Sequence, residues 1–384
     1  MRILGLSSYP TDAAATRFRM TQYVEPLRQH GIELTIEPFL TSEQFRQLYA
    51  KGASAGKVLG ILASLIRRLK GLRQSRRYDV LFVQREAMFF GPGIFEWLYR
   101  VIGGLPMVLD LDDATYISYV SPTYGRIGSA LKFVHKTDKL IGASTLVTCG
   151  NRIIAEYAEA LGARTKIIPT IVDTDQFKPK LKRSAKPVIG WIGTHSTFRV
   201  LEDFFPVIEH LAGKHQFVLK IIGSGKAEIK IPGVDLVNGP WTLEHEVSDF
   251  QSLDIGLYPI KVTSSMPADW ILAKSGFKAI QYLAVGIPFV MSPVGICAEI
   301  GEPGVTHFNA TNHDEWFAAL EKLLMNPILR LRMGAAGREH CLREYQLSDQ
   351  AQKLATVLFR AAGNELIELV GDERRPKIND SGKF

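Results

Sequence analysis

The sequence predicts an α/β protein made of two doubly wound domains. Short apolar runs alternate with helical patterns, which is typical of parallel sheets whose two faces are both covered by helices. This alternation starts twice, once on each side of a Pro- and Lys-rich stretch near residues 169–186. Ligands of such sheets bind beyond the carboxyl ends of the strands. We therefore expect the functional site in a cleft between the two domains.

The first domain is expected to span residues 1–170 and the second residues 171–350. A helix is expected around residues 17–30, after the first strand. The apolar runs that predict strands are 2–7, 32–38, 79–84, 106–111 and 146–150 in the first domain, and 186–193, 217–223, 254–260 and 287–292 in the second. Residues 327–366 look mainly helical, with Asn326 as the candidate cap and Pro327 at the first helical position. Residues 371–384 are expected to form a polar tail.

Composition restricts the class of protein. The 384 residues are 46% hydrophobic and 22% charged, as in ordinary globular chains, and their net charge of +7 suits an anionic ligand or a membrane surface without requiring either. Cys149, Cys297 and Cys341 lie far apart, which argues against a disulfide framework or a structural zinc site and predicts a reducing, cytoplasmic compartment. We expect no secretory signal and no membrane-spanning helix, because every apolar run is too short or interrupted by charges.

The most informative segment covers residues 268–295. Lys274, Ser275 and Gly276 precede an apolar-periodic helix at 277–284 that contains Lys278. A helix N-terminus with free N–H groups, a glycine that permits close approach and two lysines together form an anion site that would fit a diphosphate. The same residues also fit an ordinary Ser-Gly cap with two solvated lysines.

This segment, KSGFKAIQYLAVGIPFVMSPVG, resembles the donor-binding helix of the retaining glycosyltransferases of family 4, which have the GT-B fold. The segments RILGLSSYP, VIGWIGTHS, LKIIGSG and DIGLYPI resemble other parts of that family in the same order, so that the likeness covers most of residues 1–350. The resemblance implies two Rossmann-like domains that face a central cleft, the first for the acceptor and the second for the nucleotide-sugar. It also implies C-terminal helices that cross back, with residues 351–370 packed on the first domain.

The resemblance implies a donor site in the second domain. Family members carry two carboxylates eight residues apart in this region, and here Ala273 and Gln281 occupy those positions. Gln281 can still hydrogen-bond a ribose. Thr194 occupies the position of a family arginine, so we expect Arg199 to share the diphosphate clamp with the two lysines. The expected donor-binding residues are Gly193, Thr194, His195, Trp241, Lys274, Ser275, Gly276, Phe277, Lys278 and Gln281; Trp241 could border the nucleobase or lie at the edge of the core.

The carboxylates after the strand at 106–111 admit several interpretations. Asp110, Asp112 and Asp113 could belong to a metal-binding DxD, to a phosphatase nucleophile motif that here has Ala114 at its fifth position, or to a helix cap. In the family resemblance Asp112 takes the place of a histidine near the donor sugar. The catalytic residues implied are then Lys274, Arg199 and Asp112, without a metal ion, because fixed cations stabilise the departing diphosphate. The expected acceptor-binding residues are Arg17, Arg19, Arg85, Glu86, Asp110 and Asp113; the first two could equally be solvated.

Residues 51–77 carry eight basic side chains and no acidic one, and apolar residues are interspersed among them. Such a basic amphipathic helix is typical of an element that lies on an anionic membrane surface. It could equally be a helix docked on the first sheet with a solvated basic face. Nucleic acid is not an expected partner, because no known binding module accompanies the basic residues.

Together these observations and the resemblance predict a glycosyltransferase of polysaccharide biosynthesis. The family likeness implies that it retains the configuration of the sugar and that it transfers a hexose. It would move a sugar from a UDP- or GDP-linked donor to a glycan or lipid-linked acceptor, without a cofactor. We expect it in the cytoplasm, with the inner face of the plasma membrane as its place of attachment if residues 51–77 bind lipid. The alternative is a non-catalytic nucleotide- or sugar-binding protein of the same fold, which the missing carboxylates at Ala273 and Gln281 suggest.

Overall fold

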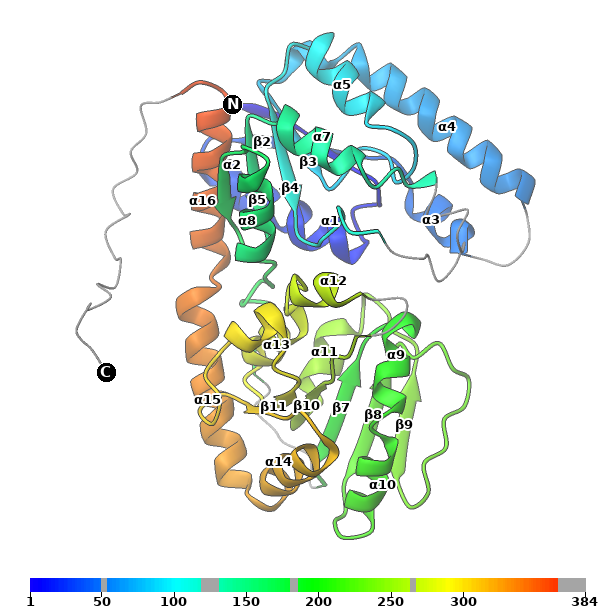
Figure 1. Cartoon of the computed structure of the whole chain (residues 1–384), viewed down its shortest axis with the longest axis vertical. Coiled ribbons are helices and arrows are strands. Elements are labelled where there is room, and N and C mark those ends of the chain that lie inside the picture. The colour runs from blue at the N-terminus through cyan, green and yellow to red at the C-terminus, as the bar shows by residue number, and fades with distance from the viewer. Residues whose placement is uncertain (50–53, 119–130, 180–185, 263–266, 365–384) are drawn as a thin grey trace, which may run out of the picture.

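The computed structural model describes residues 1–49, 54–118, 131–179, 186–262 and 267–364 (Figure 1). Two six-stranded parallel sheets form the centres of two domains, in the orders β2-β1-β3-β4-β5-β6 and β12-β11-β10-β7-β8-β9. Helices cover both faces of each sheet (Figure 1). The predicted pair of doubly wound α/β units is confirmed. Residues 365–384, which include the expected polar tail at 371–384, lie outside the described residues.

The first sheet consists of β1 (Arg2–Ser7), β2 (Glu33–Pro38), β3 (Val80–Gln84), β4 (Met107–Leu111), β5 (Leu146–Cys149) and β6 (Thr165–Ile167). β3 and β4 are buried along their whole length, which explains their continuous apolar sequences. After β1 the chain first adds β2 on one side and then crosses to β3 on the other. The strand order therefore reverses between β1 and β3, which is where such sheets bind ligands.

The second sheet consists of β7 (Val188–Ile192), β8 (Val218–Ile222), β9 (Asp235–Gly239), β10 (Ile255–Tyr258), β11 (Phe289–Met291) and β12 (Phe308–Asn309). The corresponding reversal lies between β7 and β10, which pair through Ile189 and Gly190. The carboxyl ends of β7 and β10 therefore mark the expected position of a ligand site in this domain.

The helices of the first domain are α1 (Ala14–Arg19), η1 (Thr21–Tyr23), α2 (Val24–Gln29), α3 (Ser42–Tyr49), α4 (Ser54–Leu72), η2 (Ser75–Arg77), α5 (Ile94–Val101), α7 (Lys136–Ala143) and α8 (Arg152–Ala160). The single helix expected at 17–30 is broken into α1, η1 and α2. Pro26 lies in the first turn of α2, and its lack of an N–H prevents a continuous hydrogen-bond ladder through this stretch.

The remaining helices are α9 (His195–Glu202), α10 (Phe205–Ala212), α11 (Glu246–Gln251), α12 (Ala268–Leu272), α13 (Phe277–Ala284), η3 (Gly295–Glu299), α14 (His313–Met325), α15 (Pro327–Glu344) and α16 (Leu347–Ala361). No helix among the described residues is long and apolar enough to cross a bilayer. Asn326 caps α15 as expected, since its side chain accepts a hydrogen bond from the N–H of Leu329 at 2.9 Å.

The two last helices join the domains. α15 packs against α13, and its Gly334 approaches Gly286 so closely that a Cβ there would lie 2.2 Å from the Gly286 carbonyl oxygen. After the break at Tyr345 and Gln346, α16 packs on the first domain, where Leu358 joins the buried cluster that contains β1 and β3 residues. The C-terminal helices therefore cross back from the second domain to the first (Figure 1).

Candidate active site

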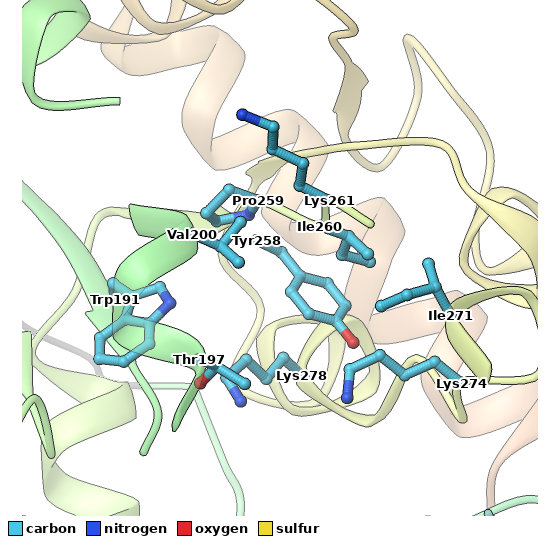
Figure 2. A pocket seen from close by; sticks show the side chains of 10 residues that line it. All are labelled: Trp191, Thr197, Val200, Tyr258, Pro259, Ile260, Lys261, Ile271, Lys274 and Lys278. Carbon is cyan, nitrogen blue, oxygen red and sulfur yellow. The ribbon is translucent and has the colours of Figure 1, made fainter. Parts of the chain in front are cut away.

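A pocket lies at the carboxyl ends of β7 and β10, where the strand order of the second sheet reverses (Figure 2). The residues that line it are Trp191, Thr197, Val200, Tyr258, Pro259, Ile260, Lys261, Ile271, Lys274 and Lys278. The strand ends supply its aromatic side chains, and α9, α12 and α13 with their adjoining turns supply most of the rest. This is the position that the sequence predicts for a donor site.

Two lysines dominate the electrostatics of this pocket. Figure 2 shows the amino groups of Lys274 and Lys278 on the same side as the Tyr258 hydroxyl. Lys274 Nζ lies 4.8 Å from the ring centre of Trp270. Within the part of the chain that the structure describes, neither lysine forms an ion pair with a carboxylate. Burial, together with the charge of Lys274, lowers the pKa of Lys278 to about 8. A bound anion would offset both the cost of burying the Lys278 charge and its repulsion by Lys274.

The turn that precedes α13 is possible because of one glycine. Gly276 has φ = 65°, and a Cβ at this position would lie 2.0 Å from Cδ1 of Ile300. Gly276 provides no side-chain cap, so the first N–H groups of α13 have no capping side chain. The structure thus combines an open helix N-terminus with Lys274 and Lys278, as the sequence predicts.

The loops after β7 and β8 touch through their glycines. A Cβ at Gly193 would lie 2.2 Å from the Trp191 ring, and a Cβ at Gly223 would lie 2.2 Å from the Gly193 carbonyl oxygen and 3.3 Å from Trp241. These contacts bring Gly193 and Trp241 to the same edge of the sheet. Trp241 is 37% exposed and is not among the residues that line the pocket, so its contact with a nucleobase stays a prediction.

The other predicted donor residues have varied surroundings. Thr194 and His195 are exposed at the start of α9, where Thr194 forms a capping box with Thr197. Ser275 is half-buried. The ring of Phe277 contacts that of Phe18 of the first domain at a tilt of 57°, with ring centres 4.5 Å apart, and so connects the domains.

Arg199 and Gln281 are absent from the pocket lining. Arg199 is exposed on α9, whose buried residues include Phe198 and Leu201, so the structure offers no contact that supports its share in a diphosphate clamp, and that role stays a prediction. Gln281 is only 4% exposed, and its contact with a ribose stays a prediction. A third pocket lysine, Lys261, was missed by sequence reasoning. Its amino group points away from the other two (Figure 2) and pairs with Asp203 at 2.6 Å.

Across the cleft, Asp112 at the end of β4 is held by an arginine. Arg85 donates two hydrogen bonds to it, at 2.6 and 2.7 Å, and Gln84 Nε2 donates a third at 3.2 Å. Burial alone would raise the pKa of Asp112, but the Arg85 guanidinium lowers it overall. Asp112 is therefore ionised and both of its carboxylate oxygens accept hydrogen bonds, while its expected catalytic role stays a prediction.

Two further pairs correct the expected acceptor residues. Arg19 and Asp110 form a bidentate ion pair in which each side chain is 2% exposed, and Arg19 also donates to the Ile168 carbonyl oxygen. Glu86 pairs with buried Lys136 at 2.7 Å. Arg19, Asp110 and Glu86 are thus internal supports of the rim, because their charges are already paired and buried.

Asp113 and Arg17 remain as candidates that face the second domain. Burial raises the pKa of Asp113, against the opposing charges of Arg85 and Lys274. Arg17 pairs with Glu246 of the second domain at 2.7 Å, and its buried Nε and Nη2 have no hydrogen-bond partner among the residues that the structure describes. Asp113 also pairs with Arg85 at 3.7 Å, so it lies beside the Arg85–Asp112 pair after the end of β4. No group of three or more His, Cys, Asp or Glu residues within the described ranges is arranged to hold a metal ion.

Two parallel six-stranded sheets and C-terminal helices that cross back from the second domain to the first form the arrangement of the GT-B fold of glycosyltransferases, which confirms the predicted fold class. Residues 207–356 match the family model described as "Glycosyl transferase-like". A search of the curated proteins found no match.

Solved structures show the same fold at low identity. The Anabaena protein HepE in complex with UDP-glucose has a TM-score of 0.67 and 13% identity, over 94% of this chain and 100% of that one. Sucrose-phosphate synthase from Thermosynechococcus elongatus has a TM-score of 0.65 and 12% identity, over 94% and 99%. A glycosyltransferase from Rickettsia africae has a TM-score of 0.63 and 10% identity, over 94% and 98%. At these identities the likeness concerns the fold.

Proposed function

We propose that this protein is a retaining glycosyltransferase that moves a hexose from a nucleotide-sugar to a glycan or lipid-linked acceptor in polysaccharide biosynthesis. The observation that carries the proposal is the pair Lys274 and Lys278, which lies without a described carboxylate partner at the open N-terminus of α13. The family match at 207–356 includes this helix, and the HepE structure contains UDP-glucose, which supports a UDP-linked rather than a GDP-linked donor.

In this proposal the second domain stabilises the leaving group. Transfer of the sugar leaves a nucleoside diphosphate with additional negative charge. Lys274, Lys278 and the first N–H groups of α13 are oriented before the reaction and would offset that charge as it develops. We propose that these fixed cations act without a metal ion or cofactor.

The first domain would present the acceptor. The charge of Lys274 influences the pKa of Asp113 without forming an ion pair with it, and we propose that Asp113 orients an acceptor or sugar hydroxyl. Arg85 holds the adjacent Asp112 and thereby fixes the end of β4. Closure of the two domains around the donor would exclude water and limit hydrolysis.

The non-catalytic alternative has one observation in its favour. Ala273 is buried, and its carbonyl oxygen already accepts a hydrogen bond from Asn151 at 2.8 Å, so neither its side chain nor this oxygen is free to hold a donor sugar. A protein that binds nucleotide-sugars without turnover would have the same lysine pocket. Turnover, and not binding, separates the two functions.

The first experiment compares nucleotide binding and turnover in two matched variants. Calorimetry with UDP, GDP and their glucose conjugates, with and without EDTA, should show selective EDTA-insensitive binding. Lys274→Ala should weaken it roughly 10- to 100-fold, because a charge-assisted hydrogen bond contributes about 1.5–3 kcal/mol. Arg199→Ala, on the exposed side of α9, should leave it unchanged.

The outcomes distinguish the proposals. Absence of binding by any nucleotide would reject the donor site. Release of UDP from UDP-sugar by the wild type, and its loss in Lys274→Ala, would support the transferase. Tight binding with no release of UDP under any acceptor mixture would favour the non-catalytic protein.

A further inference from the structure

An exposed apolar stripe runs along α4 on the surface of the first domain. Val58, Leu59, Leu62, Ile66 and Leu69 are each between 48% and 66% exposed. Their spacing of about one helical turn places them on one side of the helix. Single exposed apolar residues are common on protein surfaces, but five on one helix face form a continuous patch that calls for a partner.

The neighbouring helix carries a second stripe. On α5, Ile94, Trp97 and Val101 are spaced by three and four residues and are all exposed, Trp97 to 54%. α4 and α5 pack against each other, and the Tyr99 hydroxyl of α5 donates a hydrogen bond to the Arg68 carbonyl oxygen of α4 (Figure 1). We call the eight apolar residues of these two stripes the α4–α5 face.

This face is not the side by which α4 attaches to its own domain. Attachment is provided by buried Arg68, which donates hydrogen bonds to the carbonyl oxygens of Glu37, Ser7 and Ala87. Leu65 and Leu72 pack against the core on the same side. The expectation that Arg68 belongs to a solvated basic face is therefore wrong. Because α4 is already anchored, its apolar stripe is left exposed.

Basic side chains lie beside the face. Residues 51–77 contain no acid, and Lys70, Arg73, Arg76 and Arg77 are exposed at the end of α4 and in η2. An apolar stripe with a tryptophan and flanking cations complements the anionic headgroups and acyl boundary of a membrane. A second copy of this chain would bring the same cations against each other, which disfavours self-association at low ionic strength.

We propose that the α4–α5 face docks the protein on an anionic membrane surface, with its apolar side chains in the interface and Lys70, Arg73, Arg76 and Arg77 against the headgroups. The proposal goes beyond the proposed function and does not depend on it. The segment from Arg85 to Gly93 connects the cleft rim to α5 directly. Docking would thus hold the first-domain rim near the membrane.

Vesicle flotation of the full chain tests this proposal. Wild type should bind vesicles of phosphatidylglycerol and phosphatidylcholine and bind pure phosphatidylcholine much less. The triple variant Leu62→Gln/Ile66→Gln/Leu69→Gln should lose at least tenfold in partition, because its side chains no longer enter the interface. The matched control Ile328→Gln/Leu331→Gln changes residues of α15 that are 78% and 53% exposed, and it should bind like wild type.

A second set of variants isolates the charges. Lys70→Gln, Arg73→Gln and Arg76→Gln should each reduce partition to anionic vesicles roughly fivefold and weaken its salt dependence. Circular dichroism and thermal unfolding of each variant confirm that it is folded. Trp97→Gln provides an independent test of the α5 stripe and should also reduce partition.

Three outcomes would overturn the proposal. The first is a wild-type protein that does not bind anionic vesicles. The second is a triple variant that binds vesicles as well as the wild type does. The third is a wild-type dimer in light scattering that becomes a monomer in the triple variant, while vesicle binding stays unchanged. The last would assign the face to a second copy of the chain. None of these outcomes bears on nucleotide binding, which the lysine-pocket variants test separately.

Discussion

The two rims that face the cleft use charge in opposite ways. On the first-domain rim the ions are paired with each other, as Arg19 is with Asp110 and Arg85 is with Asp112. On the second-domain rim Lys274 and Lys278 have no carboxylate partner among the described residues. The comparison teaches that paired ions give a rim its shape, whereas unpaired cations leave it able to bind an anion.

This difference has consequences for stability. Removal of one partner from a buried pair leaves an uncompensated charge, so substitutions on the first-domain rim should destabilise the fold. Removal of a half-buried, unpaired cation relieves a desolvation penalty that is already present, so the corresponding change on the second-domain rim should stabilise the fold.

The largest effect is expected for Asp110→Asn. The substitution leaves Arg19 charged and buried with only neutral partners, and it should lower the free energy of unfolding by about 3–5 kcal/mol. Urea unfolding measures this loss. Arg152→Ala is the control, because Arg152 makes its ion pair with Glu299 in solvent, and that change should leave unfolding nearly unaltered. Equal small losses in the two variants would contradict the structural role of the buried pair.

An effect of opposite sign is expected for Lys278→Met. The pKa of Lys278 in the folded protein, about 8, lies below its ordinary value of 10.5, so burial of the charged form opposes folding at pH 7. Its removal should raise the free energy of unfolding by an amount on the order of 1–3 kcal/mol and weaken UDP binding. Lys230→Met, in which the replaced side chain is 81% exposed, should do neither. A Lys278→Met protein that is destabilised and binds UDP normally would contradict the difference between the two rims.

The smallest effect concerns pH. Since the Lys278 pKa is lowered in the folded state, stability should rise between pH 8 and 10.5, where the unfolded chain keeps a proton that the folded chain has lost. Affinity for UDP should move the other way and fall severalfold from pH 7 to 9. Binding at pH 8 should take up protons, which calorimetry in buffers of different ionisation enthalpy detects. If the Lys278→Met variant takes up the same number of protons, the proton uptake belongs to another group.

The central strands were predictable because burial on both faces gives them uninterrupted apolar sequences, as in β3 and β10. The edge strands β6, β9 and β12 were missed. They have three, five and two residues, and their partly exposed side chains follow no such pattern. Short edge strands are defined by the pairing of their backbones with a neighbour, which local sequence does not specify.

The site was predictable only in part. Lys274 and Lys278 were identified because a Lys-Ser-Gly turn before a helix is a local pattern. Arg199 lies outside the pocket lining because closeness in sequence does not fix the side of a helix, and the buried apolar neighbours Phe198 and Val200 indicate that it faces solvent. The pairing of Arg19 with Asp110 joins residues 91 positions apart, so that only the folded arrangement of β4 and α1 reveals it.

The crossing of the chain between the domains determines how they can move. The connection that follows β6 and the break before α16 lie together, since the Thr174 hydroxyl is 3.4 Å from the Gln346 side chain and Arg338 donates to the Thr174 carbonyl oxygen. Both covalent links are therefore at one edge of the molecule. We therefore expect a change in the separation of Asp113 and Lys274 to be a rotation about that edge and not a parallel sliding of the two domains.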